Sequence, residues 1–520
     1  MKKAIALSLA FVFISVVYFP AWSAQERPAP SPPQKIAEAA KPSGPVKPVV
    51  DPDLTAVTKH SVTIGGKPLA YSATCGMLPI IENGKTMAHI FYIAYIKDGV
   101  ADKSGRPILF SFNGGPGSSS VWMHLGFTGP RRVAYGEEGW LPKPPYGLTD
   151  NEFSVLDEAD IVYIDPVGTG YSRMMPGEDA HKYHGVMEDI QSVGEFIRLY
   201  LSRNDRWASP KFVIGESYGT TRAAGLTGYL SQLGISLNGT ILVSTMTLGV
   251  QTGDDLSYVT ILPHYTATAW FHKKLPADLQ AKPLRDVLDE SEKFAVGEYT
   301  LALVRGNGLT AEEKDAVARK LARLTGLAVD YLKESNLRVS RPSFRKELLR
   351  AEGFSVGRLD SRYKGVQTGV AGETFESDPA MSAWMGPFTT MANAYFKEEL
   401  KYSTDLVYHI FGDVRPWKGL QTTGMTTTSV PFVAGVGDLL RQALAANSFL
   451  RVLVLEGYYD AACDYFSALY AFSHLDPAGF AKDRVKFAFY ECGHMMYIRR
   501  PDLAQAKKDL AEFIRAAAAK

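Results

Sequence analysis

The sequence is poor in cysteine. Its 520 residues include only three, Cys75, Cys463 and Cys492. These are too few for a disulfide-stabilised scaffold and odd in number, so at least one must be a free thiol or pair with another molecule. No Cys-x-x-Cys pair of the zinc-binding or redox type occurs. Stability must therefore come from a large core, for which a hydrophobic share of 46% is sufficient.

The sequence also lacks an excess of charge of either sign. It has 56 Lys and Arg against 55 Asp and Glu, and no run of basic residues stands out. Because proteins that bind nucleic acids concentrate positive charge on one surface, we predict no nucleic-acid partner. No internal repeat is present either.

The first residues carry the pattern of an export signal. Two lysines precede an apolar stretch at 4–19, and cleavage after Ser23 puts Ala21 and Ser23 at the small-residue positions that a signal peptidase requires. We therefore predict a signal peptide at 1–23 and a periplasmic or extracellular location, without stable membrane association after cleavage. An uncleaved membrane anchor is the alternative, because about 20 apolar residues are enough to cross a bilayer.

The stretch after the signal has the composition of a linker. Residues 24–54 are rich in Pro, Ala and Lys and show no apolar period, so we predict a disordered tether. Beyond it, alternating runs such as SVTIGG and AHIFYIAYIKDG, separated by glycine turns, predict antiparallel strands.

Apolar strands and amphipathic helices then alternate in two blocks, at 55–250 and at 436–520. Runs such as PILFSF, DIVYID, KFVIG and RVLVLEG are typical of strands buried on both faces. VMEDIQSVGEFIRLYL carries its apolar residues on one helical face, and this alternation predicts a mostly parallel sheet. Charged helical patterns such as AEEKDAVARKLARL interrupt it over 251–435, where we predict an inserted, largely helical cap.

One serine has the surroundings of a nucleophile. Ser217 lies in GESYG, between the strand-like KFVI and the helix-compatible TTRAAGLTGYL. This strand–turn–helix context is that of a nucleophile elbow, in which Gly215 and Gly219 allow a sharp turn and close backbone packing. A serine hydroxyl needs a base to remove its proton, usually a histidine that a carboxylate orients.

His494 is the best-placed candidate for that base. It follows a predicted strand in ECGHMMY, and Asp460 follows the preceding strand in EGYYDAACDY. Ser, Asp, His is the chain order of α/β hydrolases, although periodicity leaves Asp464 as a rival to Asp460. The other histidines lack this placement, and no metal-ligand spacing occurs around them.

A glycine-rich loop follows an early strand in FSFNGGPGSSS, at 110–120. Its glycines let backbone amides approach a substrate, as an oxyanion hole requires. The loop fits neither the Gly-x-Gly-x-x-Gly nor the Gly-x-x-x-x-Gly-Lys pattern of phosphate sites.

Five segments, NGGPGSSS, DPVGTGYS, GESYGT, GYYDAACD and GHMMY, resemble in this order the signature segments of the serine carboxypeptidase family. The resemblance covers most of 105–260 and 450–500. It implies an α/β-hydrolase fold, with a mostly parallel central sheet and an inserted cap, and it implies neither a metal nor an organic cofactor.

The resemblance also implies a role for individual residues and favours Asp460 over Asp464. The resemblance implies that Ser217 is the nucleophile, that His494 is the base and that Asp460 orients it. It implies that the amides of Gly115 and Tyr218 form the oxyanion hole. Asn113, Gly114 and Glu216 would then recognise a substrate carboxylate, and Cys463 and Met495 would line the leaving-group pocket.

The sequence departs from the family pattern at three positions. Ser111 and Ser118 stand where the family usually has tryptophan and cysteine. Phe127 replaces the glutamate that commonly supports the carboxylate-binding network. A disulfide between Cys463 and Cys492 is a further hypothesis.

These patterns lead to a hypothesis about function: an exported serine carboxypeptidase that removes the last residue of peptides with a free C-terminus through an acyl-enzyme. Because a triad and an oxyanion hole do not choose the leaving group, an esterase or acyltransferase on the same scaffold is the first alternative. A catalytically silent binding protein is the second.

Overall fold

The computed structural model describes residues 51, 53–246, 248–249, 253–373, 375, 377–419 and 435–519. The predicted signal peptide and nearly all of the predicted tether lie outside the described residues. Contacts divide the chain into two units, Met1–Pro48 and Val49–Lys520, and all described helices and strands belong to the second. None of these helices is both long and apolar enough to cross a membrane.

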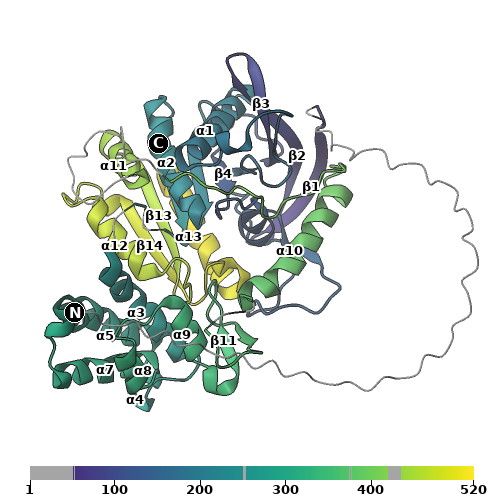
Figure 1. The fold of residues 1–520 in the computed structure, drawn as a ribbon. Coiled ribbons are helices and arrows are strands. Elements are labelled where there is room, and N and C mark those ends of the chain that lie inside the picture. Colours follow the sequence, from purple (N-terminus) through teal and green to yellow (C-terminus); the bar gives the residue numbers. More distant parts are fainter. Residues whose placement is uncertain are drawn as a thin grey trace, which may run out of the picture. The chain divides into compact units, whose positions relative to one another are not determined.

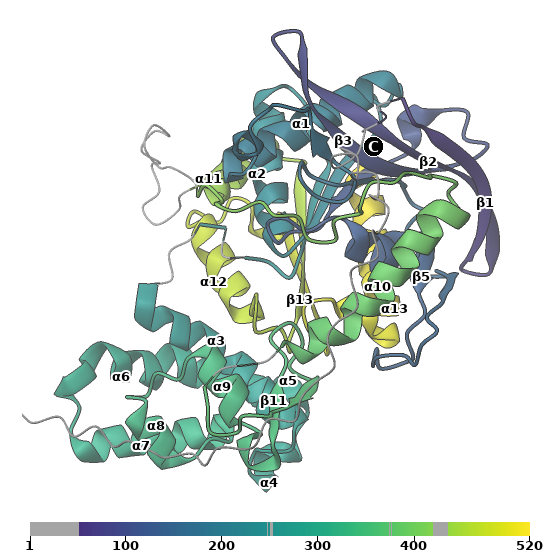
Figure 2. The same cartoon turned by 45° about the vertical axis from the view of Figure 1, so that its right-hand side comes forward.

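Six strands of a central sheet run parallel to one another; Figure 2 labels one of them, β13. They lie in the order β7, β4, β9, β10, β13 and β14. Every residue of β4, β7 and β10 is buried, as expected for strands that helices cover on both faces. The predicted mostly parallel sheet is confirmed. The six strands span, in the order of the sheet, Asp160–Ile164, Ile108–Phe112, Lys211–Glu216, Gly239–Val243, Arg451–Gly457 and Val485–Tyr490.

Antiparallel strands extend the sheet beyond β7. β3 pairs with β7, and β2 and β1 follow outward. The turn between β1 and β2 consists of Gly65 and Gly66, whose φ angles of 56° and 76° are those that a two-residue hairpin turn requires. Strands β1, β2 and β3 span Ala56–Ile64, Lys67–Glu82 and Lys85–Lys97; the shorter β5, β6 and β8 span Arg131–Val133, Leu148–Asp150 and Arg173–Met174.

Helices cover both faces of the sheet (Figure 1). The strands therefore contribute alternate residues to two hydrophobic cores; in β4, Phe110 lies in one core and Leu109 in the other. Helices α1, α2 and α11 pack on the side of Phe110, whereas α10 and α13 pack on the side of Leu109. Helices α1, α2, α10, α11, α12 and α13 span Val186–Arg203, Tyr218–Gln232, Pro379–Glu398, Val436–Ala446, Tyr465–Leu475 and Arg500–Ala518.

A helical subdomain follows β10 in the chain. Helices α3 to α9 and strand β11 contribute to a core of their own, which includes Phe344 and Val356. α7 begins at a capping box formed by Thr310 and Glu313 and ends at Gly326 in the left-handed conformation. The helices span Gly253–Phe271, Ala277–Gln280, Leu284–Phe294, Thr300–Arg305, Ala311–Thr325, Val329–Glu334 and Arg341–Glu347; hairpin strands β11 and β12 span Phe354–Val356 and Lys364–Val366.

The stretch that the sequence presents as one insertion therefore has two parts. The helical subdomain is the first, and α10 is the main element of the second. α10 returns to the sheet, where Trp384, Phe388 and Tyr395 pack into the core on the side of Leu109.

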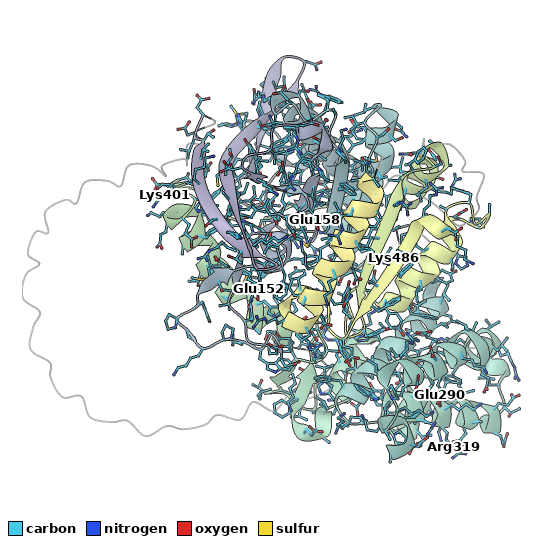
Figure 3. All side chains as sticks on the ribbon, turned by 180° about the vertical axis from the view of Figure 1, so that it is seen from behind. Glu152, Glu158, Glu290, Arg319, Lys401 and Lys486 are labelled. Carbon is cyan, nitrogen blue, oxygen red and sulfur yellow. The ribbon has the colours of Figure 1, made fainter. Side chains whose placement is uncertain are left out.

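Ion pairs attach α13 to the segment that precedes β7. Glu152 and Glu158 lie beside this helix (Figure 3), and they pair with Arg500 and Arg515. Exposed pairs of this kind contribute only about 0–1 kcal/mol each. Helix α13 is therefore held mainly by its buried apolar face.

A buried charge network joins three segments at the start of β7. Asp160 accepts hydrogen bonds from Arg106 at 3.2 Å and from Arg206 at 2.6 Å. It also accepts one from the backbone of Lys97, in β3, at 3.0 Å. All three charged side chains are at most 9% exposed, so each charge is stabilised by its partners and not by water.

Replacing Asp160 by alanine should destabilise the sheet unit strongly. Asp160→Ala leaves two buried guanidinium groups without their carboxylate, which costs about 3–5 kcal/mol of unfolding free energy. Asp330→Ala is the matched control, because Asp330 is 85% exposed and pairs with Lys333 at 3.4 Å; its cost should be about 0–1 kcal/mol. Urea unfolding followed by circular dichroism measures both, and equal losses would contradict the prediction.

Candidate active site

Ser217 lies at the sharp turn between β9 and α2. Its φ and ψ are 60° and −128°, a conformation that non-glycine residues rarely adopt. Two backbone hydrogen bonds hold it, from its amide to the carbonyl of Val243 at 2.9 Å and from the amide of Thr220 to its carbonyl at 2.8 Å. A Cβ at Gly215 would lie 2.1 Å from the carbonyl oxygen of Gly219. Glycine at 215 is therefore a steric requirement of the turn.

His494 and Asp460 follow two adjacent parallel strands, β14 and β13. Nδ1 of His494 lies 2.6 Å from Oδ2 of Asp460, and their side chains are 6% and 0% exposed. The other oxygen, Oδ1, accepts hydrogen bonds from the amides of Ala462 at 2.7 Å and Cys463 at 3.0 Å. The carboxylate is thus fixed in one orientation, with Oδ2 toward the imidazole.

The same carboxylate controls the protonation of the imidazole. Burial lowers the pKa of His494, but the charge and hydrogen bond of Asp460, together with the charge of Glu216, raise it, and the pKa is raised overall. The rival carboxylate, Asp464, has other partners. It accepts from the amide of Ser467, in α12, at 2.9 Å and pairs with Arg341 at 2.6 Å. Asp460 is therefore the carboxylate that orients His494.

Glu216 is buried next to Ser217, with 3% of its surface exposed. Oε1 accepts a hydrogen bond from Nδ2 of Asn113 at 3.0 Å, and Oε2 accepts one from the hydroxyl of Tyr497. Burial raises the pKa of Glu216 to about 7, although the charge of His494 and these two hydrogen bonds act in the opposite direction. This carboxyl group can therefore exist protonated near neutral pH.

The glycine-rich loop packs against the turn at Ser217. A Cβ at Gly114 would lie 2.4 Å from the amide nitrogen of Tyr218 and 2.6 Å from the carbonyl oxygen of Glu216. Gly115 has a φ of 104°, which favours glycine. The loop thus lies beside the N-terminus of α2, where amides lack helical acceptors.

A buried arginine holds this arrangement. Arg222, on α2, is 1% exposed and donates to the carbonyl of Asn113 at 2.6 Å and to Asp189, on α1, at 2.8 Å. The hydroxyl of Tyr218 also donates to Asp189, at 3.2 Å. Sequence analysis did not find Arg222 or Asp189, because no motif links α1 to the glycine-rich loop.

Cys463 and Met495 are buried near the histidine. The sulfur of Cys463, an oxygen of Asp460 and a ring nitrogen of His494 lie within 4.8 Å of one another, and Met495 is the residue after His494. Such a group could hold a metal ion, but the protein already satisfies both oxygens of Asp460. In addition, burial raises the pKa of the Cys463 thiol well above its usual value. These residues therefore do not suit a metal site, which needs a thiolate.

The hypothesised disulfide between Cys463 and Cys492 is not formed, and all three cysteines are free. The sulfur of Cys492 instead accepts a hydrogen bond from Arg362 at 2.9 Å. Arg362 is also paired with Asp360 at 2.7 Å.

The segment at 358–361, in the loop between β11 and β12, contacts both sides of the His494–Asp460 pair. Leu359 accepts from the amide of His494 at 2.6 Å, and Arg358 accepts from the amide of Ala461 at 3.0 Å. Asp360 accepts from the amide of Gly493 at 3.2 Å. No sequence pattern signalled these contacts, because they join segments about 100 residues or more apart.

The structure shows the contacts of two positions that depart from the family pattern, Ser118 and Phe127. Ser118 accepts a hydrogen bond from the indole of Trp122 at 3.0 Å. Phe127 stacks on Tyr497 with ring centroids 5.1 Å apart and 8° between the planes.

Part of the chain matches known sequences. Residues 67–233 match a family model described as serine carboxypeptidase. Serine carboxypeptidase-like 45 of Arabidopsis thaliana is 28% identical over 183 residues, which cover 31% of this chain and 35% of that protein. Serine carboxypeptidase-like 33 of the same plant is 30% identical over 142 residues, 26% of this chain and 27% of that protein. The matches thus span about a third or less of these curated relatives.

A solved structure matches more of the chain. Kex1(delta)p, a prohormone-processing carboxypeptidase from Saccharomyces cerevisiae, aligns with 85% of this chain and 91% of its own, with a TM-score of 0.51 and 16% identity. At this identity the likeness concerns the fold, and it agrees with the predicted α/β-hydrolase architecture. The sequence matches thus show a similarity to serine carboxypeptidases over about a third of this chain, and the structural match shows a similar fold.

Proposed function

We propose that this protein is a serine carboxypeptidase that hydrolyses the last peptide bond of peptides through an acyl-enzyme. The observation that carries the proposal is the buried pair of Asn113 and Glu216 beside Ser217. A triad alone would suit any acyl transfer. A carboxyl group that can be protonated near neutral pH, next to the nucleophile, suits a substrate with its own carboxylate.

In the proposed reaction, the hydroxyl oxygen of Ser217 attacks the carbonyl carbon of the last peptide bond. Nε2 of His494 accepts the hydroxyl proton, and Asp460 stabilises the imidazolium that results. The amides of Gly115 and Tyr218 donate to the oxyanion. His494 then protonates the leaving amino group, and water hydrolyses the acyl-enzyme by the same steps.

In the proposed recognition step, the protonated form of Glu216 binds the C-terminal carboxylate of the substrate. A neutral carboxyl group can donate a hydrogen bond to the substrate carboxylate, whereas an ionised one would repel it. The amide group of Asn113 has two N–H donors, so one can bind Glu216 and the other the substrate. We assign the amide of Gly114 to the same carboxylate, and Cys463 and Met495 to the leaving-group pocket.

The remaining assignments are parts of the same proposal. Residues 1–23 act as a signal peptide for export to the periplasm or the extracellular space, and 24–54 form a tether. The cap at 251–435 joins the two parts of the catalytic core, at 55–250 and 436–520. The proposed chemistry uses no metal and no organic cofactor.

Ser217→Ala should abolish turnover of a blocked peptide with a free C-terminus, because the acyl-enzyme cannot form. A loss of at least about 10⁴-fold in kcat is expected for the removal of such a nucleophile. Ser202→Ala, on the exposed side of α1, is the control and should retain full activity. A fluorophosphonate probe should label the wild type but not Ser217→Ala. If the wild type is neither labelled nor active, the protein is a silent binding protein.

Recognition of the free acid should depend on pH. The ratio of KM for a free-acid peptide to KM for its C-terminal amide should rise as pH passes about 7, where Glu216 ionises, approaching tenfold per pH unit. The ionisation of His494 affects KM for both substrates, so its effect cancels in the ratio. In Glu216→Gln, which cannot ionise, it should stay flat. An enzyme that hydrolyses simple esters but shows no preference for the free acid would be an esterase or acyltransferase instead.

The ionisation of Glu216 should also appear in stability, without any substrate. Because its pKa is raised from 4.5 in the unfolded chain to about 7 in the folded one, the native state holds the proton more tightly, and stability falls as pH rises between these values. Glu216→Gln removes this loss. The unfolding free energy of the variant, relative to wild type, should therefore increase by about 3 kcal/mol from pH about 4.5 to pH about 8.

The control for that measurement is Glu512→Gln. Glu512 is 66% exposed and lies 3.5 Å from Lys486. Its variant should follow the pH dependence of the wild type. A Glu216→Gln curve parallel to that of the wild type would contradict a raised pKa for Glu216.

A further inference from the structure

The carboxyl group of Glu216 has a partner outside the proposed triad and glycine-rich loop. The hydroxyl of Tyr497 donates a hydrogen bond to Oε2 of Glu216, while Asn113 binds Oε1. Each oxygen of Glu216 is therefore engaged by a different segment of the chain. Since one hydrogen bond would leave the carboxyl group able to rotate, the second bond fixes its plane.

Tyr497 is itself held rigidly. It is 1% exposed, and its ring stacks on Phe127 with centroids 5.1 Å apart. A Cβ at Gly126 would lie 2.6 Å from the same ring, so the absence of a side chain at 126 makes room for it. Stacked aromatic rings and close packing restrict the ring to one position.

We propose that Tyr497 is a positioning residue for substrate recognition: its hydroxyl orients the carboxyl group of Glu216 toward the substrate carboxylate and sets the pH range in which free-acid peptides bind. This inference rests on the proposed function, because it assigns Glu216 to the substrate carboxylate. It gives a role to a residue that lies in the GHMMY segment but for which neither the resemblance nor the comparisons imply one.

The direction of the pH effect follows from the groups that face Glu216. His494 stabilises the ionised form by its charge, and Asp460 destabilises it. Asn113 and Tyr497 stabilise it by donating hydrogen bonds. Removing the Tyr497 hydroxyl takes away one donor to the carboxylate, so the pKa of Glu216 rises. The protonated form, which binds the free acid, then persists to higher pH.

The test is Tyr497→Phe, which keeps the ring and its packing on Phe127. At pH about 5.5, where Glu216 is protonated in both proteins, KM for a free-acid peptide should rise about 3- to 10-fold, the usual effect of losing one hydrogen bond. The pH at which the ratio of free-acid to amide KM begins to rise should move upward. The kcat and KM for the amide and for an ester should stay unchanged.

Tyr490→Phe is the matched control. Tyr490 is also a buried tyrosine, 2% exposed, and its hydroxyl also donates to a carboxylate, that of Asp509, at 2.8 Å. It lies on the α13 side of β14. This variant loses the same kind of bond, so a general effect of such a loss on folding would appear in both variants. The pH midpoint should not move in Tyr490→Phe.

The outcomes separate this inference from the proposed function. If the wild type shows the free-acid preference and its loss at high pH, but Tyr497→Phe has an unchanged midpoint, Tyr497 is not a positioning residue and the proposed function stands. If Tyr497→Phe impairs amide and ester turnover equally, its role is structural and the inference is wrong. If the wild type shows no preference for the free acid, both fail.

Discussion

The close packing of Gly114 against the turn at Ser217 is the constraint on which the rest of the site depends. No side chain fits between the two backbones, since a Cβ at Gly114 would overlap the amide of Tyr218. This contact brings the amide group of Asn113 to Glu216, and it lets Arg222 reach the carbonyl of Asn113. The close contact between these two backbone segments thus places the polar groups of Glu216 and Arg222 within hydrogen-bonding distance of Asn113.

Burial then gives those polar groups their chemistry. Glu216 has hydrogen bonds to both oxygens and the charge of His494 nearby, and each of these favours its ionised form. The cost of removing the carboxylate from water is larger, so the pKa of Glu216 still rises to about 7. The carboxylate of Asp460 has different partners, because two backbone amides and an imidazole surround it. Glu216, by contrast, is held by two side chains, the amide of Asn113 and the hydroxyl of Tyr497.

The sequence was sufficient to predict the sheet, because the apolar runs of β4, β7 and β13 are typical of strands buried on both faces and alternate with amphipathic helices. The turn at Ser217 also followed from local residues, since Gly215 and Gly219 lie within the same motif. Tyr497, Arg222 and Asp360 could not be predicted. Each acts through a contact across the fold, and a tyrosine, arginine or aspartate at such a position has the same local pattern whether it packs, pairs with an ion or orients a neighbour.

The contacts of the segment at 358–361 link His494 to a distant part of the chain. This segment lies in the loop between β11 and β12, yet it accepts hydrogen bonds from the backbone amides of Ala461, Gly493 and His494. The loops that carry the imidazole and its carboxylate are thus completed by a stretch that the sheet itself does not contain. These hydrogen bonds lie outside the ladders of the sheet, so their loss would remove a support of the histidine without breaking a strand pair. The placement of the imidazole and the pairing of the strands therefore rest on different hydrogen bonds.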